Sequence, residues 1–438
     1  MLVVVTQQNR MTAAAAVSIV GSVSAELLGS CAGMFARVES RRLAADAVAG
    51  LQADLPEKNC WTIAKNAGHA DPWRLQHFFN DGAWDEDGVR SSVARAAWDQ
   101  IADAPERVLV FDETGDLKKG QDTVGVQRQY TGTAGRIENA TVTVFAAWAT
   151  PEARLLVDYE IYLPRSWTAD PDRLARAGVP DDVGFATKIE QAAQILARRI
   201  EAGQIPTALA GDAVYGRSGP LRAQAEALRI AYVLEVGKDC QARPDPALPA
   251  ERVDALAEAI PTRNWSNRSA GAGSRGQRVY AWGYLALDST GAQGERGLLI
   301  RWNRRKNEYA YYLTYLPEAG TNLSRLIRIA GLRWPIETTF QDTKGRFGLD
   351  QHQMRTWVSV RRWITLALLT ATANAIAHQT VRAAGSRLTL TGLARLYGEI
   401  TRTRHHDDFH DHWTEWICDH NEQARQSHYQ RRGDHQPS

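Results

Sequence analysis

Two stretches of the sequence decide the fold: RVLVFDETG at residues 107–115 and TALAGDAVYG at residues 207–216. Each begins with an apolar, strand-like run and then reaches an aspartate, Asp112 or Asp212, beside small or polar residues. The glycines on either side of Asp212 let the backbone turn sharply and leave its carboxylate accessible. Taken singly, each aspartate fits a turn or helix-cap residue better than a metal ligand. Together they place two carboxylates at strand ends, where functional groups are often held.

A third acidic residue, Glu337, lies in the stretch LRWPIETTFQDTKGRF. Pro335 suits the first turn of a helix, so Glu337 is expected near a helix N-terminus. It would then face away from the apolar anchors Ile336 and Phe340. The helix dipole by itself favours a carboxylate at that position. If all three carboxylates converge, they bind two Mg²⁺ or Mn²⁺ ions about 4 Å apart, an arrangement suited to in-line phosphoryl transfer.

Hydrophobic periodicity indicates an α/β protein with a mixed sheet flanked by helices. Three β-branched runs at residues 107–112, 141–149 and 155–163 predict antiparallel strands, and helix-linked strands follow at 207–210 and 231–236. We expect six segments: an N-terminal extension (1–33), a helical domain that is a candidate for DNA binding (34–102), the first part of an α/β core (103–236), a β-rich insertion (237–322), a helical second part of the core carrying Glu337 (323–384), and a C-terminal helical region with a His-rich tail (385–438).

The stretch at residues 60–79 has the spacing of a helix-turn-helix. Ala64 permits close helix packing, Gly68 permits the turn, and Asp71-Pro72 suits the start of a second helix. An ordinary helical hairpin has the same pattern, so DNA binding and simple packing both remain open.

Charge and cysteine content exclude several classes of protein. The 438 residues include 52 basic and 50 acidic ones, and this near balance gives no sign of nucleic-acid binding from net charge alone. The four cysteines are far apart, which excludes a disulfide framework and a paired-cysteine zinc knuckle and suits a reducing compartment. Residues 1–28 resemble a signal peptide only weakly, and the apolar run at 364–377 is too short to span a bilayer. We therefore expect a cytoplasmic protein with no membrane partner.

The last 34 residues hold seven of the eleven histidines. Zinc binding is conceivable, but no pair has the usual ligand spacing. A solvated, partly disordered tail is the favoured interpretation.

The motifs VFDETGDLKKG, VGVQRQYTGTAGRIENATVTVF, GDAVYG and RWPIETTFQDTKGRFGLD resemble the DDE transposases of bacterial insertion sequences, and most closely the insertion-sequence 701 family. The resemblance runs from about residue 35 to residue 384. It implies a ribonuclease H-like catalytic domain in which Asp112, Asp212 and Glu337 bind the metal ions. It also implies a β-rich insertion before the helix that carries Glu337.

A related group of hairpin-forming transposases has a Tyr, Arg, Glu, Lys series around the catalytic glutamate. Arg333, Glu337 and Lys344 fit its spacing, whereas Ala330 occupies the tyrosine position. The resemblance implies that the arginine and lysine contact DNA phosphates. The missing phenol leaves the use of a hairpin intermediate open.

Other residues are weaker candidates for contacts with DNA. Lys118 and Lys119 follow Asp112 closely, and Arg128 and Arg136 flank a run of small residues. Either a DNA contact or a solvated loop explains them. Tryptophans 265, 282 and 302 in the insertion could stack on a base, but core packing is the more common role of such residues.

We therefore expect a transposase that binds the terminal inverted repeats of an insertion sequence, cleaves the ends and joins the 3′-hydroxyls to target DNA. Its partner is double-stranded DNA, its active form a synaptic homodimer, and its location the nucleoid. A DNA-binding regulator with idle carboxylates and a stand-alone metal-dependent nuclease are the alternatives.

Overall fold

The computed structural model describes residues 11–132, 134–273, 276–318, 320–402 and 405–433. The chain divides into two compact units, which are described separately. Unit 1 comprises Met1–Val89, Thr343–Met354 and Val358–Ser438, and unit 2 comprises Arg90–Asp342 and Arg355–Trp357. Helices α5 (Glu86–Asp99), α13 (Pro335–Phe347) and α14 (Trp357–Ala383) each have residues in both units.

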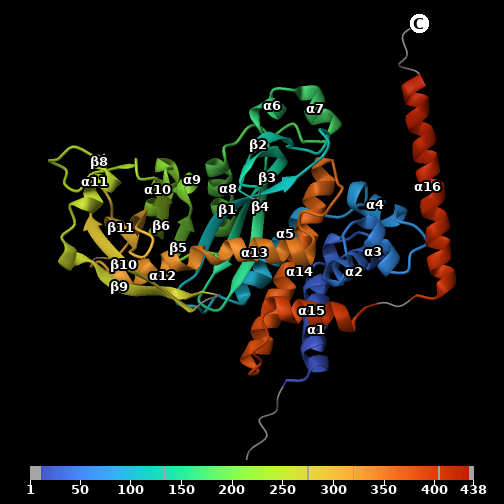
Figure 1. Cartoon of the computed structure of the whole chain (residues 1–438), viewed down its shortest axis with the longest axis horizontal. Helices are drawn as coiled ribbons and strands as arrows, with labels where there is room; N and C mark the ends of the chain where they lie inside the picture. Colours follow the sequence, from blue (N-terminus) through green and yellow to red (C-terminus); the bar gives the residue numbers. More distant parts are fainter. Residues whose placement is uncertain (1–10, 133, 274–275, 319, 403–404, 434–438) are drawn as a thin grey trace, which may run out of the picture. The chain divides into compact units, whose positions relative to one another are not determined.

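Unit 2 is built on one ten-stranded mixed sheet (Figure 1). Its strands run in the order β2-β3-β1-β5-β6-β12-β11-β10-β9, with β4 also paired to β3. They are β1 (Val108–Leu117), β2 (Gln127–Thr131), β3 (Arg136–Ala149), β4 (Arg154–Tyr162), β5 (Ala208–Gly211), β6 (Ala231–Val236), β9 (Ser266–Gly273), β10 (Gly276–Ala286), β11 (Glu295–Asn303) and β12 (Glu308–Leu316).

The central part of this sheet has the ribonuclease H-like arrangement. β1 pairs antiparallel with β3, and β3 pairs antiparallel with β4. On its other side β1 pairs parallel with β5, which pairs parallel with β6. The expected α/β fold with a mixed sheet is confirmed.

Strand β1 is longer than the sequence pattern predicts. Asp112 was expected to end it, but β1 continues to Leu117, which pairs with Ala140 of β3. The reason is that β3 is 14 residues long and supplies backbone partners beyond Asp112. The parallel neighbour β5 ends at Gly211, so Asp112 stands where the parallel pairing stops.

The β-rich segment after β6 extends the core sheet. β12 pairs antiparallel with β6, and β11, β10 and β9 follow outward in that order. A short ribbon of β7 (Gln241–Ala242) and β8 (Glu251–Arg252) also belongs to this segment, with α11 (Val253–Glu258) and the 3-10 turn Thr262–Asn264.

Helices cover both faces of the sheet in unit 2. Tyr232 of β6 bonds to Glu226 in α10 (Gly219–Ala227), so α10 lies on one face. Glu235, three residues later and therefore on the opposite face, contacts α12 (Leu323–Arg333). Two more helices lie on the same face as α10: α8 (Lys188–Glu201) and α9 (Ala213–Gly216). Helix α8 begins with a capping box. The connection before α8 contains α6 (Arg165–Thr168) and α7 (Pro171–Arg176).

Unit 1 is helical. Besides its parts of α5, α13 and α14, it contains α1 (Ala13–Ser30), the 3-10 turn Ala32–Met34, α2 (Val38–Gln52), α3 (Cys60–Asn66), α4 (Trp73–Asn80), α15 (Leu390–Ile400) and α16 (Asp407–Gly433). The expected helical hairpin is formed by α3 and α4. Gly68 turns with a φ of +80°, and the Asp71 carboxylate accepts the Trp73 N–H at 2.9 Å. The apolar run at 364–377, which is too short to span a bilayer, is a largely buried part of α14.

The N-terminal helix α1 packs within unit 1. Ala16 and Val20 lie in one apolar cluster with Ala377 and Val381 of α14 and Leu393 of α15. By length and a mean hydropathy of 1.5, α1 would also be able to cross a membrane, or to serve as a signal sequence. Residues 1–10 lie outside the described residues.

The His-rich tail is mostly one long helix, α16, and the interpretation as a partly disordered tail is wrong for residues 407–433. An aromatic stripe explains the difference. Trp413 is 1% exposed and donates to the carbonyl of His69, while the ring of Trp416 meets Trp61 of α3 edge-on at 4.8 Å. Burial of these rings against the helical hairpin holds the first half of α16 in place.

Candidate functional site

Asp112 and Asp212 lie at matching positions on two adjacent parallel strands. Phe111 of β1 is level with Gly211 of β5, so the residue after each is an aspartate at the same edge of the sheet. Asp212 is the N-cap of α9, and its carboxylate accepts the Val214 N–H at 2.9 Å. Backbone pairing therefore brings these two predicted carboxylates together.

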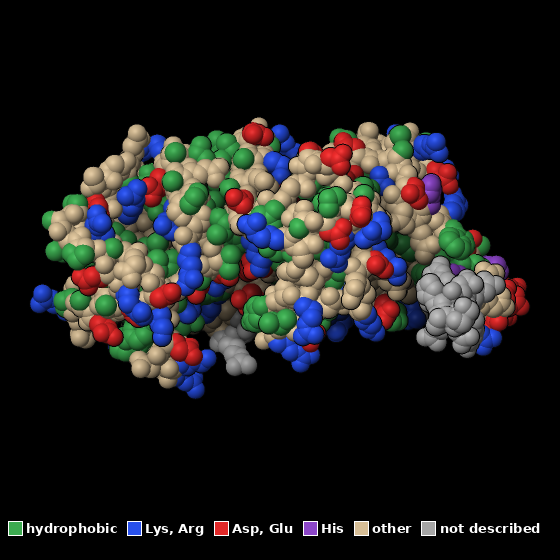
Figure 2. All heavy atoms as spheres, turned by 90° about the horizontal axis from the view of Figure 1, so that it is seen from above, with side chains coloured by type: hydrophobic (Ala, Val, Ile, Leu, Met, Phe, Trp, Pro, Cys, Tyr) green, Lys and Arg blue, Asp and Glu red, His purple; other side chains and the backbone are tan. Residues whose placement is uncertain are grey.

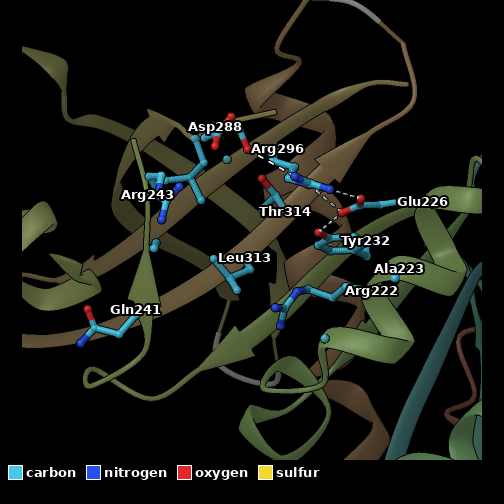
Figure 3. Close-up of a pocket in the computed structure, with 14 residues that line it drawn as sticks. Arg222, Ala223, Glu226, Tyr232, Gln241, Arg243, Asp288, Arg296, Leu313 and Thr314 are labelled. Atoms are coloured by element: carbon cyan, nitrogen blue, oxygen red, sulfur yellow. Dashed lines mark hydrogen bonds and ion pairs between the residues drawn. The ribbon is translucent and has the colours of Figure 1, made fainter. Parts of the chain in front are cut away.

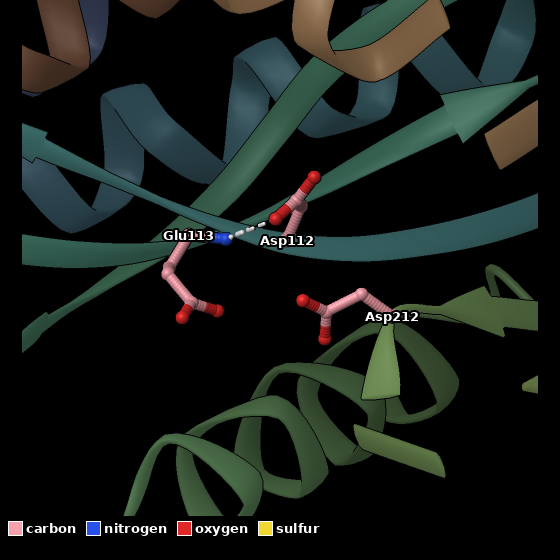
Figure 4. A group of neighbouring side chains, drawn as sticks. All are labelled: Asp112, Glu113 and Asp212. Carbon is pink, nitrogen blue, oxygen red and sulfur yellow. Dashed lines mark hydrogen bonds between the residues drawn. The ribbon is translucent and has the colours of Figure 1, made fainter. Parts of the chain in front are cut away.

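Glu113 joins the two aspartates (Figure 4). One carboxylate oxygen from each of the three residues lies within 4.8 Å of the others. Glu113 points to the opposite face of β1 from Asp112 because side chains alternate along a strand. Its two oxygens accept hydrogen bonds from Lys188 Nζ at 2.7 Å and from the Tyr215 hydroxyl at 2.9 Å. Both carboxylate oxygens of Glu113 are thus already engaged by its own partners.

The electrostatics of this group favour a bound cation. Burial, together with the charge of Asp212, raises the pKa of Asp112 to about 7. Burial and the charge of Glu113 also raise the pKa of Asp212. Two carboxylates held close in a low-dielectric site repel one another, and hard oxygen donors are the ligands that Mg²⁺ and Mn²⁺ prefer. The donor set therefore fits a divalent metal.

Arg333 lies on the same face of the sheet as Asp112. Its guanidinium donates to Glu235 of β6 at 3.1 Å, and Glu235 is level with Asp112 across the parallel strands. The positive charge of Arg333 opposes the rise in pKa of both Asp112 and Asp212. Sequence reasoning predicted Arg333 but missed Glu235, although Glu235 is the only charged residue in the strand AYVLEV.

Glu337 lies in the first turn of α13, which begins at Pro335 as predicted. Its side chain is exposed, opposite the buried Ile336 and Phe340. The Phe340 ring packs on Phe145 with 5.5 Å between centroids, and Phe145 is directly opposite Asp112 in the β1–β3 pair. Helix α13 therefore crosses the Asp112 face.

Glu337 does not belong to the group of carboxylates within 4.8 Å that the described residues form. Of the three carboxylates expected to converge, the structure brings Asp112 and Asp212 together, with Glu113 as the third member. Sequence reasoning noticed Glu113 only as the neighbour of Asp112, and its partners Lys188 and Tyr215 are too distant in sequence to reveal the contact.

The other residues predicted to contact DNA have varied surroundings. Lys118 is held at 2.6 Å from Asp116 and is largely buried, whereas Lys119 and Arg128 are exposed. Arg136 is exposed and lies 2.7 Å from Glu138. Lys344 belongs to unit 1, where its ammonium lies 3.6 Å from Asp350.

The tryptophans of the β-rich segment divide into two kinds. Trp282 is fully buried and belongs to the core, in agreement with the interpretation of these tryptophans as core residues. Trp265 and Trp302 are half-buried and meet edge-on with 5.6 Å between ring centroids.

A separate cavity of about 300 Å³ lies away from the carboxylates (Figure 3). It is lined by α10 and by strands β6, β11 and β12, on the face that carries Tyr232. Arg296 and Glu226 form an ion pair at 2.6 Å in its wall. Arg222 and Arg243 also line it.

Comparison with known proteins identifies the family. Residues 32–264, more than half of the chain, match the family described as DDE superfamily endonuclease. The chain belongs to the DDE endonuclease superfamily. Residues 182–373 also match the family described as transposase DDE domain. The expected resemblance to DDE transposases is confirmed.

A curated relative matches part of the chain. A probable transposase for insertion sequence element IS701 from Microchaete diplosiphon is 31% identical over 172 residues, which are 39% of this chain. The match covers 42% of the relative, so the chain spans less than half the length of that curated protein.

Two solved structures show weak overall likeness. A piggyBac transposase synaptic complex with hairpin DNA has a TM-score of 0.41 at 10% identity, covering 93% of this chain and 85% of that one. The NurA nuclease from Sulfolobus solfataricus has a TM-score of 0.26 at 7% identity, covering 58% and 86%. Neither likeness is close enough to carry a functional comparison.

Proposed function

We propose that this protein is a DNA transposase. It binds the terminal inverted repeats of an insertion sequence, cleaves the DNA at each end and joins the freed 3′-hydroxyls to target DNA. The observation that supports this most strongly is the pairing of Asp112 and Asp212 at one edge of the sheet, in a chain of the DDE endonuclease superfamily. We place its action on bacterial DNA in the cytoplasm.

Asp112 and Asp212 would hold two Mg²⁺ or Mn²⁺ ions, and Glu337 would complete the set from α13. When bound, such ions activate the attacking water or hydroxyl and stabilise the leaving oxygen of an in-line displacement. The position of α13 on the Asp112 face supports the assignment of Glu337. Glu113, whose oxygens are occupied by Lys188 and Tyr215, would tie strand β1 to α8 and α9 rather than bind metal.

Arg333 would place a positive charge beside the phosphate that reacts. Its guanidinium is fixed by Glu235, so little side-chain freedom is lost when a phosphate approaches. Lys344, Lys118, Lys119, Arg128 and Arg136 are proposed as further contacts with the DNA backbone. Helices α3 and α4 would recognise the repeats, and two copies would join the two ends in a homodimer.

The test uses the full chain with end-bearing DNA, a target plasmid and Mg²⁺. We expect Asp112→Asn, Asp212→Asn and Glu337→Gln each to lower cleavage by about 10³-fold or more while DNA binding persists. Glu113→Gln is the matched control, and it should retain cleavage that is easily measured.

The outcomes separate the possible functions. Joined products support transposition, cut ends alone indicate a nuclease, and retarded DNA without cutting indicates a regulatory binder. If Glu337→Gln cleaves at the wild-type rate while Glu113→Gln is inactive, Glu113 is the third ligand and the assignment of Glu337 is wrong.

A further inference from the structure

The hairpin between β11 and β12 ends in a cluster of three cations. Arg304, Arg305 and Lys306 are consecutive, all are exposed, and we call them the basic tip. Figure 2 shows one face of the molecule, on which basic and acidic side chains are interspersed. The distribution of charge over that face does not by itself indicate a binding region. The basic tip is a local concentration of charge within a chain of net charge +2.

The turn that carries the basic tip is built from specific contacts. The Trp302 indole N–H donates to the Asn307 side chain at 3.1 Å, and the Lys306 N–H donates to the carbonyl of Asn303. Asn307 adopts a φ of 53°, a left-handed conformation that asparagine tolerates better than most residues. These contacts fix the turn, so its cations project from a shaped element.

Aromatic packing below the turn holds one of the cations. The rings of Trp302 and Tyr309 stack with 5.5 Å between centroids and an interplanar angle of 8°. The Arg304 guanidinium lies 4.9 Å from the Trp302 ring centroid, which limits the conformations of that side chain. A guanidinium held in this way loses less entropy when it binds an anion.

The cations of the basic tip are weakly neutralised. Lys306 approaches Glu308 at 4.0 Å, with both side chains more than half exposed. In the described part of the chain, Arg304 and Arg305 form no ion pair. Two guanidiniums and one ammonium are therefore available to an anionic partner.

Strand register places the basic tip off the same edge of the sheet as Asp112. Phe111 of β1 is level with Leu234 of β6, and Leu234 lies opposite Leu313 of β12. Because β12 runs antiparallel to β6, its earlier residues extend beyond the edge where the aspartates lie. The basic tip is then three strand spacings, about 14 Å, to the side of Asp112 and about 20 Å beyond it.

We propose that the basic tip binds the phosphate backbone of duplex DNA that is engaged at Asp112 and Asp212. The separation, on the order of 24 Å, corresponds to about seven base pairs along a duplex. This inference rests on the proposed function, since it assumes that DNA lies at the carboxylates. It assigns a DNA contact to residues of the β-rich segment that lie outside the metal-binding machinery.

The test measures the salt dependence of binding by the full chain to a 40-base-pair duplex of arbitrary sequence. Each phosphate contact contributes about 0.9 to the slope of log K against log salt. We expect Arg304→Gln/Arg305→Gln to reduce that slope by about 2 and to weaken binding by about tenfold or more at 0.1 M salt. Arg304→Lys/Arg305→Lys should retain most of the slope.

The matched control, Arg95→Gln/Arg229→Gln, also removes two exposed guanidiniums. Arg229 precedes the start of β6 and so lies at the opposite edge of the sheet, and this control should leave the slope unchanged. An unchanged slope in the tip variant, with wild-type binding and cleavage intact, overturns the inference and leaves the proposed function standing. A change in oligomeric state without a change in slope would also overturn it, in favour of a protein contact.

Discussion

The ionised form of Asp112 is energetically unfavourable in the folded protein. Burial and the nearby Asp212 together raise its pKa to about 7, even though Arg333 acts in the opposite direction. Arg333 cannot neutralise the site fully because its closest partner is Glu235. The fold therefore maintains an unfavourable pair of carboxylates, which is typical of sites selected for binding and catalysis.

Lys58 is a buried charge of a different kind, with no carboxylate at ion-pair distance among the described residues. In unit 1 its ammonium donates to the carbonyls of Ala53 at 2.7 Å and Arg346 at 2.6 Å. Burial is the main cause that lowers the pKa of Lys58 to about 8. Between pH 8 and 10.5 the folded protein has released this proton while the unfolded chain still holds it. The contribution of Lys58 to stability therefore rises with pH in that window.

We expect the difference in free energy of unfolding between the wild type and Lys58→Met to change with pH. Between pH 8 and 10 the wild type should gain up to about 1.4 kcal/mol per pH unit relative to the variant. Urea unfolding at pH 7, 8, 9 and 10 measures this difference. Parallel stability curves for the two proteins would show that Lys58 keeps an ordinary pKa.

At the scale of elements, the turn from β5 into α9 positions Asp212. Gly216 ends α9 against β6, and a Cβ built there would lie 1.8 Å from the carbonyl oxygen of Glu235. Gly216→Ala would therefore push α9 away from β6 and shift Asp212. We expect it to destabilise the protein by about 1–3 kcal/mol and to reduce cleavage.

Gly219→Ala is the matched control for this prediction, because a Cβ at Gly219 meets nothing within 4 Å. Thermal unfolding and the cleavage rate compare the two variants. Equal stability of both variants would mean that the backbone around Asp212 adapts easily, and that its position does not depend on close packing.

Local signals were enough to predict several elements of the site. Pro335 marked the start of α13, and the glycines around Asp212 marked its turn, because both act through backbone conformation. The continuation of β1 past Asp112 was not predictable, since it depends on partners in β3. The alignment of β12 with β6 likewise joins residues about 80 positions apart in sequence, which no local pattern reveals.

At the scale of the whole molecule, one helix that carries predicted site residues has residues in both units. Helix α13 carries Glu337 in unit 2 and Lys344 in unit 1. The spacing of Arg333, Glu337 and Lys344 could be recognised from the sequence. That Lys344 belongs to a different compact unit from Arg333 and Glu337 could not. The sequence also predicted the aspartate pair but not the Glu113 cluster with Lys188 and Tyr215, because that cluster forms only when α8 and α9 pack on the sheet.

The stability of the whole chain should report metal binding at the aspartates without any measurement of activity. An ion that binds only the folded protein adds about 2.7 kcal/mol at a concentration 100 times its Kd, or roughly 5–10 °C in Tm for a unit of this size. We expect Mn²⁺ to raise the Tm of the wild type by this order. Asp112→Asn removes the repulsion between the two carboxylates, so it should raise the Tm in the absence of metal and abolish most of the response to Mn²⁺.

The control for this experiment is Asp182→Asn, which removes an exposed carboxylate outside the group. Without metal, Asp182→Asn should have the same Tm as the wild type, and Mn²⁺ should raise its Tm by as much as it raises that of the wild type. Because the two effects of Asp112→Asn have opposite signs, a variant that was merely misfolded would not reproduce them. An equal rise in Tm for the wild type and Asp112→Asn would place the bound ion elsewhere and remove the electrostatic basis of the proposed site.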